Sequence, residues 1–263
     1  ELISLDAQKG KWGFGGKIIN MGAGVVNYNV LQGLFSVSYA VPLDKNKNHN
    51  LSFGLQAGAM QKTIEAGLYT FNNQYNTSDG GYFDKNLASG ETYNRQSYIR
   101  EQVNAGILYF NGKQQARLNP FLGYSVFNLT NPKETFYGSD NKLPLRHYVH
   151  AGVRINVTEL FYVLPKVLVM MQKNATEQLY SIDMGYFFKE QEFYVLAGLN
   201  YRSKDAAVFY IGARKNNYIA KIGYDANTSS LKDVSKTRGA FEISFTYTAK
   251  KSNKKDVRHC PRL

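Results

Sequence analysis

Apolar and polar residues alternate one by one over many stretches of this chain. In residues 51–59 the odd positions are apolar and the even positions are small or polar, and the same period recurs in residues 193–202 and 241–248. A β-strand directs successive side chains to opposite faces. Each stretch therefore predicts a strand with one apolar face and one polar face.

Runs of this kind predict about twelve strands. They lie near residues 11–20, 29–41, 50–64, 100–111, 117–128, 146–157, 162–172, 177–188, 193–202, 207–214, 218–225 and 238–248. A tilted strand needs about 9 to 11 residues to cross a bilayer. Soluble β-proteins mostly use strands of about 5 to 6 residues. The predicted lengths therefore favour a membrane barrel over a soluble barrel or sandwich.

The connections between predicted strands differ in length at the two ends of the sheet. The short ones fall on one side, at residues 42–49, 112–116, 158–161, 189–192 and 215–217. The longer ones fall on the other, at residues 65–99, 129–145 and 226–237, although residues 173–176 and 203–206 on that side are also short. Outer-membrane barrels have short periplasmic turns and longer external loops. This asymmetry predicts an outer-membrane location with the C-terminus in the periplasm.

The residues of the polar face indicate that the sheet closes into a membrane barrel. This face carries Gln56, Asn200, Arg202, Lys221 and Glu242, whereas a small soluble barrel fills its interior with apolar side chains. Open sheet edges are not tolerated in lipid. We therefore predict an all-β fold, a closed antiparallel transmembrane β-barrel.

The barrel is expected over residues 1–248 and a basic periplasmic tail over residues 249–263. Single-chain bacterial barrels have even strand counts. The first predicted strand runs outward, so an even number of strands precedes it, and the chain begins at Glu1 without a signal peptide. We expect N-terminal strands to be missing from the chain and the full protein to have fourteen strands.

Composition supports strands and turns. The chain has 20 Tyr, 16 Phe and 23 Gly but only 6 Pro, and no window is long and apolar enough for a transmembrane helix. The formal net charge is +12, but the basic residues are scattered through turns or gathered in the tail, so nucleic acid is not an expected partner. The crowded basic residues of the tail are Lys250, Lys251, Lys254, Lys255, Arg258 and Arg262.

Candidate chemistry is sparse. Of the four histidines, His147 and His150 stand near the start of one predicted strand and face opposite sides, which favours interfacial hydrogen bonding over catalysis. The single cysteine, Cys260, allows no internal disulfide and is distant from those histidines. We expect no enzyme, no cofactor and no metal site.

Several segments resemble one family of membrane proteins. They are FNLTNP at 127–132, RHYVHAG at 146–152, KIGYD at 221–225, GAFEISFTY at 239–247 and the terminal CPRL. Their order and spacing are similar to the PorP/SprF family of Bacteroidetes outer-membrane proteins, which serve type IX secretion and gliding motility. The likeness extends from about Lys11 to the end, without the family's characteristic N-terminal segment.

The resemblance implies a non-enzymatic barrel component of the type IX protein secretion system. Its partners would be outer-membrane lipid, periplasmic ring proteins or lipoproteins of the machine, and a secreted adhesin. The alternative is a porin or solute-specific channel.

Two regions are candidates for partner binding. In the loop at 65–99, Tyr69, Tyr75, Tyr82 and Tyr93 form a predicted contact patch, against the alternative of a mobile solvated loop. The basic tail is predicted to dock to an acidic periplasmic partner, against the alternative of a disordered end.

Overall fold

A computed structural model describes most of the chain. The described residues are 1–23, 27–91, 93, 95–113, 116–136, 141–230 and 239–248. Thirteen strands within them form one sheet, and two short strands form a separate hairpin. The basic tail, including all its predicted partner-binding residues, lies outside the described residues.

The chain divides into two compact units. Unit 1 comprises Glu1–Ser38, Gly54–Ala105 and Phe127–Leu145, and unit 2 comprises Tyr39–Phe53, Gly106–Val126 and Arg146–Leu263. Several strands begin in one unit and end in the other, because the division cuts across the large sheet.

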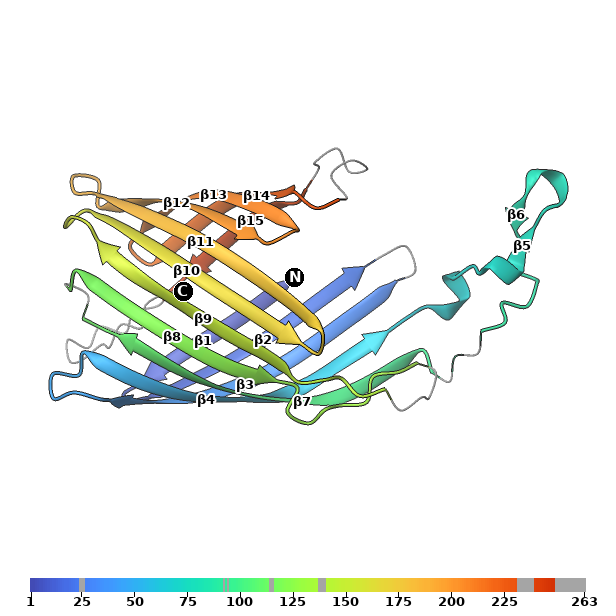
Figure 1. Cartoon of the computed structure of the whole chain (residues 1–263), viewed down its shortest axis with the longest axis horizontal. Helices are drawn as coiled ribbons and strands as arrows, with labels where there is room; N and C mark the ends of the chain where they lie inside the picture. The colour runs from blue at the N-terminus through green and yellow to red at the C-terminus, as the bar shows by residue number, and fades with distance from the viewer. Residues whose placement is uncertain are drawn as a thin grey trace. The chain divides into compact units, whose positions relative to one another are not determined.

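The first strands of the large sheet are β1 (Leu2–Lys9), β2 (Trp12–Ala23), β3 (Tyr28–Pro42), β4 (His49–Thr63), β7 (Ser97–Asn111) and β8 (Leu118–Phe127). The later ones are β9 (Arg146–Asn156), β10 (Phe161–Gln172), β11 (Ala175–Phe188), β12 (Phe193–Arg202), β13 (Ala206–Lys215), β14 (Tyr218–Asn227) and β15 (Phe241–Tyr247). Each strand pairs with the next one along the chain, except that β4 pairs with β7. Figure 1 shows β9, β10 and β11 as long neighbouring strands.

All twelve predicted strands are present, with ends within three residues of the expected ones. The large sheet nevertheless has thirteen strands, because β1 was not predicted. Ile3, Leu5 and Ala7 alternate with Ser4, Asp6 and Gln8 in this strand, so the same two-residue signal identifies it. The chain thus holds a strand before residue 11 that was not predicted, and further N-terminal strands stay a prediction.

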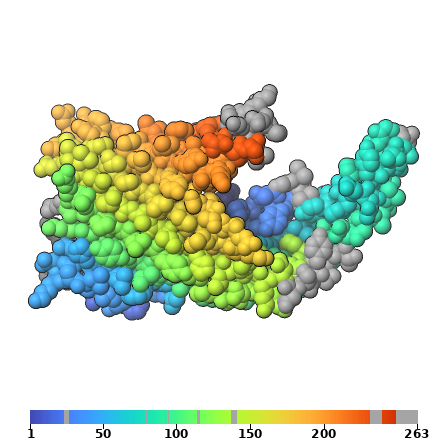
Figure 2. All heavy atoms as spheres, viewed as in Figure 1, coloured from blue at the N-terminus to red at the C-terminus, as the bar shows by residue number. Residues whose placement is uncertain are grey.

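The apolar residues of the alternating pattern lie on an exposed face. Leu199 on β12 is 41% exposed, and Ile243 on β15 is 73% exposed. In Figure 2 the side chains of β10 and β11, coloured yellow to orange, pack into an unbroken surface. The polar residues between them, such as Ser181 and Asp183 on β11, are less exposed than the apolar ones beside them. The burial pattern is thus the reverse of a soluble protein's.

The buried apolar cluster is small. It consists of Phe110, Phe121 and Leu164 in unit 2, with Leu108 and Tyr162 packed against it. No helix among the described residues is long and apolar enough to cross a membrane. Most of the sheet's stability must therefore come from strand pairing and from its side-chain contacts on both faces.

Candidate functional site

Residues 65–96, here called the aromatic loop, connect β4 to β7 in unit 1. The loop contains the three short 3₁₀ helices η1 (Ala66–Leu68), η2 (Asn72–Gln74) and η3 (Ser78–Gly80) and the hairpin strands β5 (Tyr75–Asn76) and β6 (Tyr82–Phe83). Residues 92 and 94 lie outside the described residues. The hairpin is the teal segment in Figure 1. The expected long connection is thus locally folded.

One buried side chain organises the loop. The Gln74 amide nitrogen donates to the Leu87 carbonyl oxygen at 3.0 Å, and the Gln74 amide oxygen accepts from the Phe71 backbone N–H at 3.1 Å. The Gln74 backbone oxygen also accepts from the Asp84 N–H at 2.8 Å. These bonds join Gln74 to Phe71, Asp84 and Leu87, which fixes the backbone under the aromatic side chains.

The predicted tyrosines fall into two aromatic groups. Tyr69 stacks against Phe71 at 6.1 Å and against Tyr93 at 6.3 Å between ring centroids. Tyr75 meets Phe83 edge to face at 5.2 Å across the hairpin, where the two residues are directly paired. Each such ring pair contributes about 0.5–1.5 kcal/mol beyond its buried area. The structure therefore joins Tyr69 to Tyr93, and it places Tyr75 opposite a phenylalanine that the sequence analysis did not select.

Much of this loop is apolar and exposed. Tyr75 is 48% exposed, and Tyr82, Phe83, Leu68 and Leu87 are similarly exposed. Large aromatic side chains on a fixed backbone are typical of contact surfaces between proteins. The sequence analysis selected only the tyrosines and missed Phe83, Leu68 and Leu87, although their density within twenty residues was visible.

The base of the aromatic loop is held by the connection at 128–145, also in unit 1. Lys62 at the end of β4 pairs with Glu134 at 2.8 Å. Tyr98 at the start of β7 packs against Phe136 with ring centroids 4.9 Å apart. The connection at 128–145 therefore contacts both strands that flank the aromatic loop.

A second cluster lies on the polar face of unit 2, near the short turns at 157–160, 189–192 and 216–217. The Arg154 guanidinium carbon lies 3.8 Å from the centroid of the Tyr162 ring, and that of Arg214 lies 5.4 Å from the Tyr194 centroid. The two tyrosine rings are 6.4 Å apart. The residues come from β9, β10, β12 and β13. Sequence analysis missed this cluster because identifying it requires the register of all four strands.

A charged group occupies the middle of the same face. Lys166 pairs with Asp183 at 2.6 Å, and the Lys221 ammonium lies 4.5 Å from the Tyr210 ring centroid. Tyr210 and Lys221 also interact electrostatically with Asp183. Sequence analysis placed Lys221 on the polar face, but it gave no partner for it.

The two candidate histidines face opposite sides of β9, as predicted from their spacing. The His147 Nδ1 atom is hydrogen-bonded to the Tyr124 hydroxyl oxygen at 2.8 Å, on the exposed side. His150 packs against the buried Phe121 ring at 6.0 Å on the other side. The described residues contain no group of three His, Cys, Asp or Glu side chains arranged to hold a metal ion.

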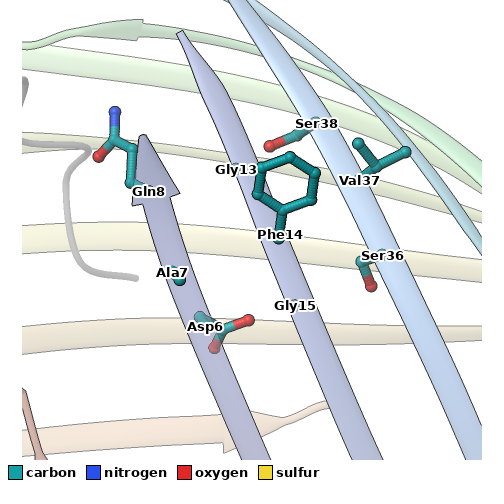
Figure 3. A pocket seen from close by; sticks show the side chains of 9 residues that line it. All are labelled: Asp6, Ala7, Gln8, Gly13, Phe14, Gly15, Ser36, Val37 and Ser38. Carbon is teal, nitrogen blue, oxygen red and sulfur yellow. The ribbon is translucent and has the colours of Figure 1, made fainter. Parts of the chain in front are cut away.

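A shallow hollow of about 270 Å³ lies on β1, β2 and β3 in unit 1. Figure 3 shows Asp6, Gly13, Gly15, Ser36 and Ser38 around it. Gly13 and Gly15 open the hollow, because a Cβ atom on either would meet Ser38 or Asp6. Asp6 is the one ionisable residue of its lining, so it provides no acid–base pair.

Comparisons with known proteins identify a family. The model of the family described as "Type IX secretion system membrane protein PorP/SprF" matches residues 3–247. No curated protein matches.

Two solved structures are among those similar to this chain. One is the CymD monoaromatic hydrocarbon channel, with a TM-score of 0.47, 13% identity, and coverage of 86% of this chain and 77% of that one. The other is the toluene transporter TbuX of Ralstonia pickettii, with a TM-score of 0.49, 8% identity, and coverage of 86% and 75%.

The family match carries the identification. It runs from β1 through β15 and so includes the strand before residue 11 as well as the segments that suggested the resemblance. This chain belongs to the PorP/SprF family of type IX secretion system membrane proteins.

Proposed function

We propose that this chain is a non-enzymatic outer-membrane β-barrel that serves type IX secretion by holding a secreted surface protein on its aromatic loop. Residues 1–248 form the barrel, and residues 249–263 form a basic periplasmic tail that approaches subunits of the machine. The observation that carries the proposal is the exposed aromatic surface on a loop whose backbone is fixed by Gln74.

The exposed apolar face supports a lipid environment. Phe209, Ile211 and Ile222 lie on neighbouring strands of unit 2 and are all exposed. Water-exposed apolar surface of this extent is unfavourable, whereas acyl chains accommodate it without cost. Strands of ten or more residues suit a tilted crossing of the bilayer.

Strand directions support a total of fourteen strands. The pairs β1–β2 and β9 through β15 are antiparallel. If direction alternates throughout a thirteen-stranded sheet, the first and last strands are parallel to each other. Antiparallel closure then requires one more strand, and closure leaves no edge in lipid.

The connections support the orientation. The turns at 157–160, 189–192 and 216–217 in unit 2 are short, whereas the aromatic loop of unit 1 is long. β15 ends beside the short turn at 216–217, where Thr248 N–H donates to the Asn217 oxygen at 2.8 Å. By the usual asymmetry of these barrels, the tail enters the periplasm and the aromatic loop faces outward.

The test is affinity purification of the tagged chain from native outer membranes, followed by mass spectrometry. The wild type is expected to bring down type IX subunits together with a secreted surface protein. The double variant Tyr82→Ala/Phe83→Ala is expected to lose the surface protein by roughly tenfold or more, because exposed aromatic anchors dominate such interfaces.

The matched control is Lys85→Ala, which removes an exposed side chain from the same loop without touching its aromatic rings. Limited proteolysis shows whether each variant keeps the loop folded. Equal recovery of the surface protein with both variants would contradict the assignment to the aromatic loop. Conductance in planar bilayers with no co-purifying subunit would favour a channel instead.

A further inference from the structure

Two arginines at the short-turn end of unit 2 each lie over one of two neighbouring tyrosine rings. Tyr194 on β12 is directly paired with Arg214 on β13, and Phe187 on β11 with Tyr194. Arg154 on β9 lies over the Tyr162 ring of β10. Both guanidinium groups are close enough to Tyr162 to interact with it electrostatically. The four residues, here called the arginine–tyrosine cluster, therefore form one contiguous group.

These arginines differ from Lys166 and Arg202 on the same face. Lys166 is paired with Asp183, and Arg202 is paired with Asp205 and Asp225. No carboxylate among the described residues lies within ion-pair distance of Arg154 or Arg214. The Arg154 side chain donates one hydrogen bond, to the Asn156 amide oxygen at 3.1 Å. Most of the guanidinium donors of the cluster are thus available to a ligand.

The rings that hold the arginines are fixed in place. Tyr162 lies over Gly185 of the neighbouring strand, where a Cβ atom would come within 2.3 Å of the ring. Tyr194 packs against Phe187 with ring centroids 4.7 Å apart. Ligand binding therefore costs little conformational entropy, because packing against the fixed rings already restricts the two arginine side chains.

We propose that the arginine–tyrosine cluster binds the carboxylates of an acidic polypeptide segment that enters the polar face from the short-turn end. Two planar guanidinium groups recognise carboxylates with paired hydrogen bonds, and tyrosine rings cover the methylene groups of Glu or Asp side chains. The orientation toward the periplasm rests on the proposed function. The binding itself does not, since the cluster and the aromatic loop belong to different units.

Binding is measured on the purified full chain in detergent, by fluorescence anisotropy of a labelled hexaglutamate peptide at low ionic strength. The wild type is expected to bind, and added salt is expected to weaken binding because the contact is electrostatic. The double variant Arg154→Gln/Arg214→Gln is expected to bind roughly tenfold or more weakly.

The matched control is Lys215→Gln. Lys215 follows Arg214 on β13 and faces the opposite side of the sheet, so this variant removes the same charge and is expected to stay within about twofold of the wild type. Replacing both arginines by lysine is expected to give intermediate binding, because charge remains and the paired geometry is lost.

Three results would overturn the proposal: no binding by the wild type, equal loss with Lys215→Gln, or stronger competition by inorganic pyrophosphate than by unlabelled hexaglutamate. The last result would assign the cluster to phosphate groups. Because the assay contains no secretion subunit and leaves the aromatic loop intact, its failure is distinguishable from failure of the proposed function.

Discussion

On the polar face of the sheet, unit 1 carries a network of neutral amides, whereas unit 2 carries a group of charges and tyrosines. In unit 1, Gln56 donates to the Ser36 hydroxyl at 2.7 Å and accepts from the Asn104 amide at 2.9 Å. The Asn104 amide oxygen accepts from the Asn128 N–H at 3.1 Å, and Gln32 is hydrogen-bonded to Gln102. These amides satisfy one another, so the network acts in stability.

Unit 2 has the same alternation but a different content. Its polar positions include Lys166, Asp183 and Lys221 in the middle and Arg154 and Arg214 near the short turns. One carboxylate lies near two lysines, and the two arginines have tyrosine rings beside them but no ion pair among the described residues. The same strand pattern thus supports two different surfaces. In unit 1 the amides hydrogen-bond one another, whereas in unit 2 the two arginines have no ion pair among the described residues and suit ligand binding.

The largest expected effect is that of Asp183→Asn. Its carboxylate is mostly buried and compensates Lys166, so its loss leaves an uncompensated cation and costs about 3 kcal/mol of unfolding free energy. The measurement is the urea unfolding transition in lipid vesicles. Asp205→Asn, in the more exposed pair with Arg202, is expected to cost less than about 1 kcal/mol. Equal costs would remove the distinction between the two pairs.

Asn104→Ala tests the amide network of unit 1. It leaves the Gln56 oxygen and the Asn128 N–H without partners in a buried environment, which is expected to cost about 2 kcal/mol. The same unfolding assay reports it. The exposed Asn20→Ala serves as control, with an expected change below about 0.5 kcal/mol. Equal unfolding free energies of the two variants would contradict a stabilising role for the hydrogen bonds of Asn104.

Gly198→Ala tests the close packing of a tyrosine ring against a glycine of the neighbouring strand in unit 2. A Cβ atom there would come within 2.1 Å of the Tyr210 ring, which must then shift and disturb its contact with Lys221, at a cost of about 1–2 kcal/mol. Gly16→Ala in unit 1 has open space around it and is expected to be neutral or stabilising. Unfolding transitions of the two variants that shift together would contradict this account.

Arg214→Gln is expected to affect stability least. It removes one cation–π contact on a half-exposed face, a loss of about 0.5–1 kcal/mol, although it weakens peptide binding. Comparing unfolding with peptide binding for this single variant separates the two roles. A stability loss as large as that of Asp183→Asn would make Arg214 a structural residue like the amides of unit 1.

Most of the sheet was predictable because a period of two is a local property of the sequence. The strands of residues 193–202 and 241–247 follow directly from it. β1 was not predicted, although its residues alternate just as clearly. The hairpin inside the aromatic loop was missed because its strands are only two residues long.

The sites were less predictable because they depend on register. Tyr75 was identified, but its contact with Phe83 depends on the turn between β5 and β6. The arginine–tyrosine cluster requires the facing of four strands at once, and an error of one residue moves a side chain to the other face. Predicted strand ends that differ by up to three residues from the observed ones cannot give that facing.

The central claim is that the apolar face meets lipid and the polar face meets water. The most direct test places single spin labels at Leu199 and at Asn200, neighbours on opposite faces of β12, in a Cys260→Ser chain in lipid vesicles. The account predicts that the label at 199 collides preferentially with oxygen dissolved in lipid, and that the label at 200 collides with a water-soluble nickel complex. Equal access of both labels to the nickel complex would contradict it.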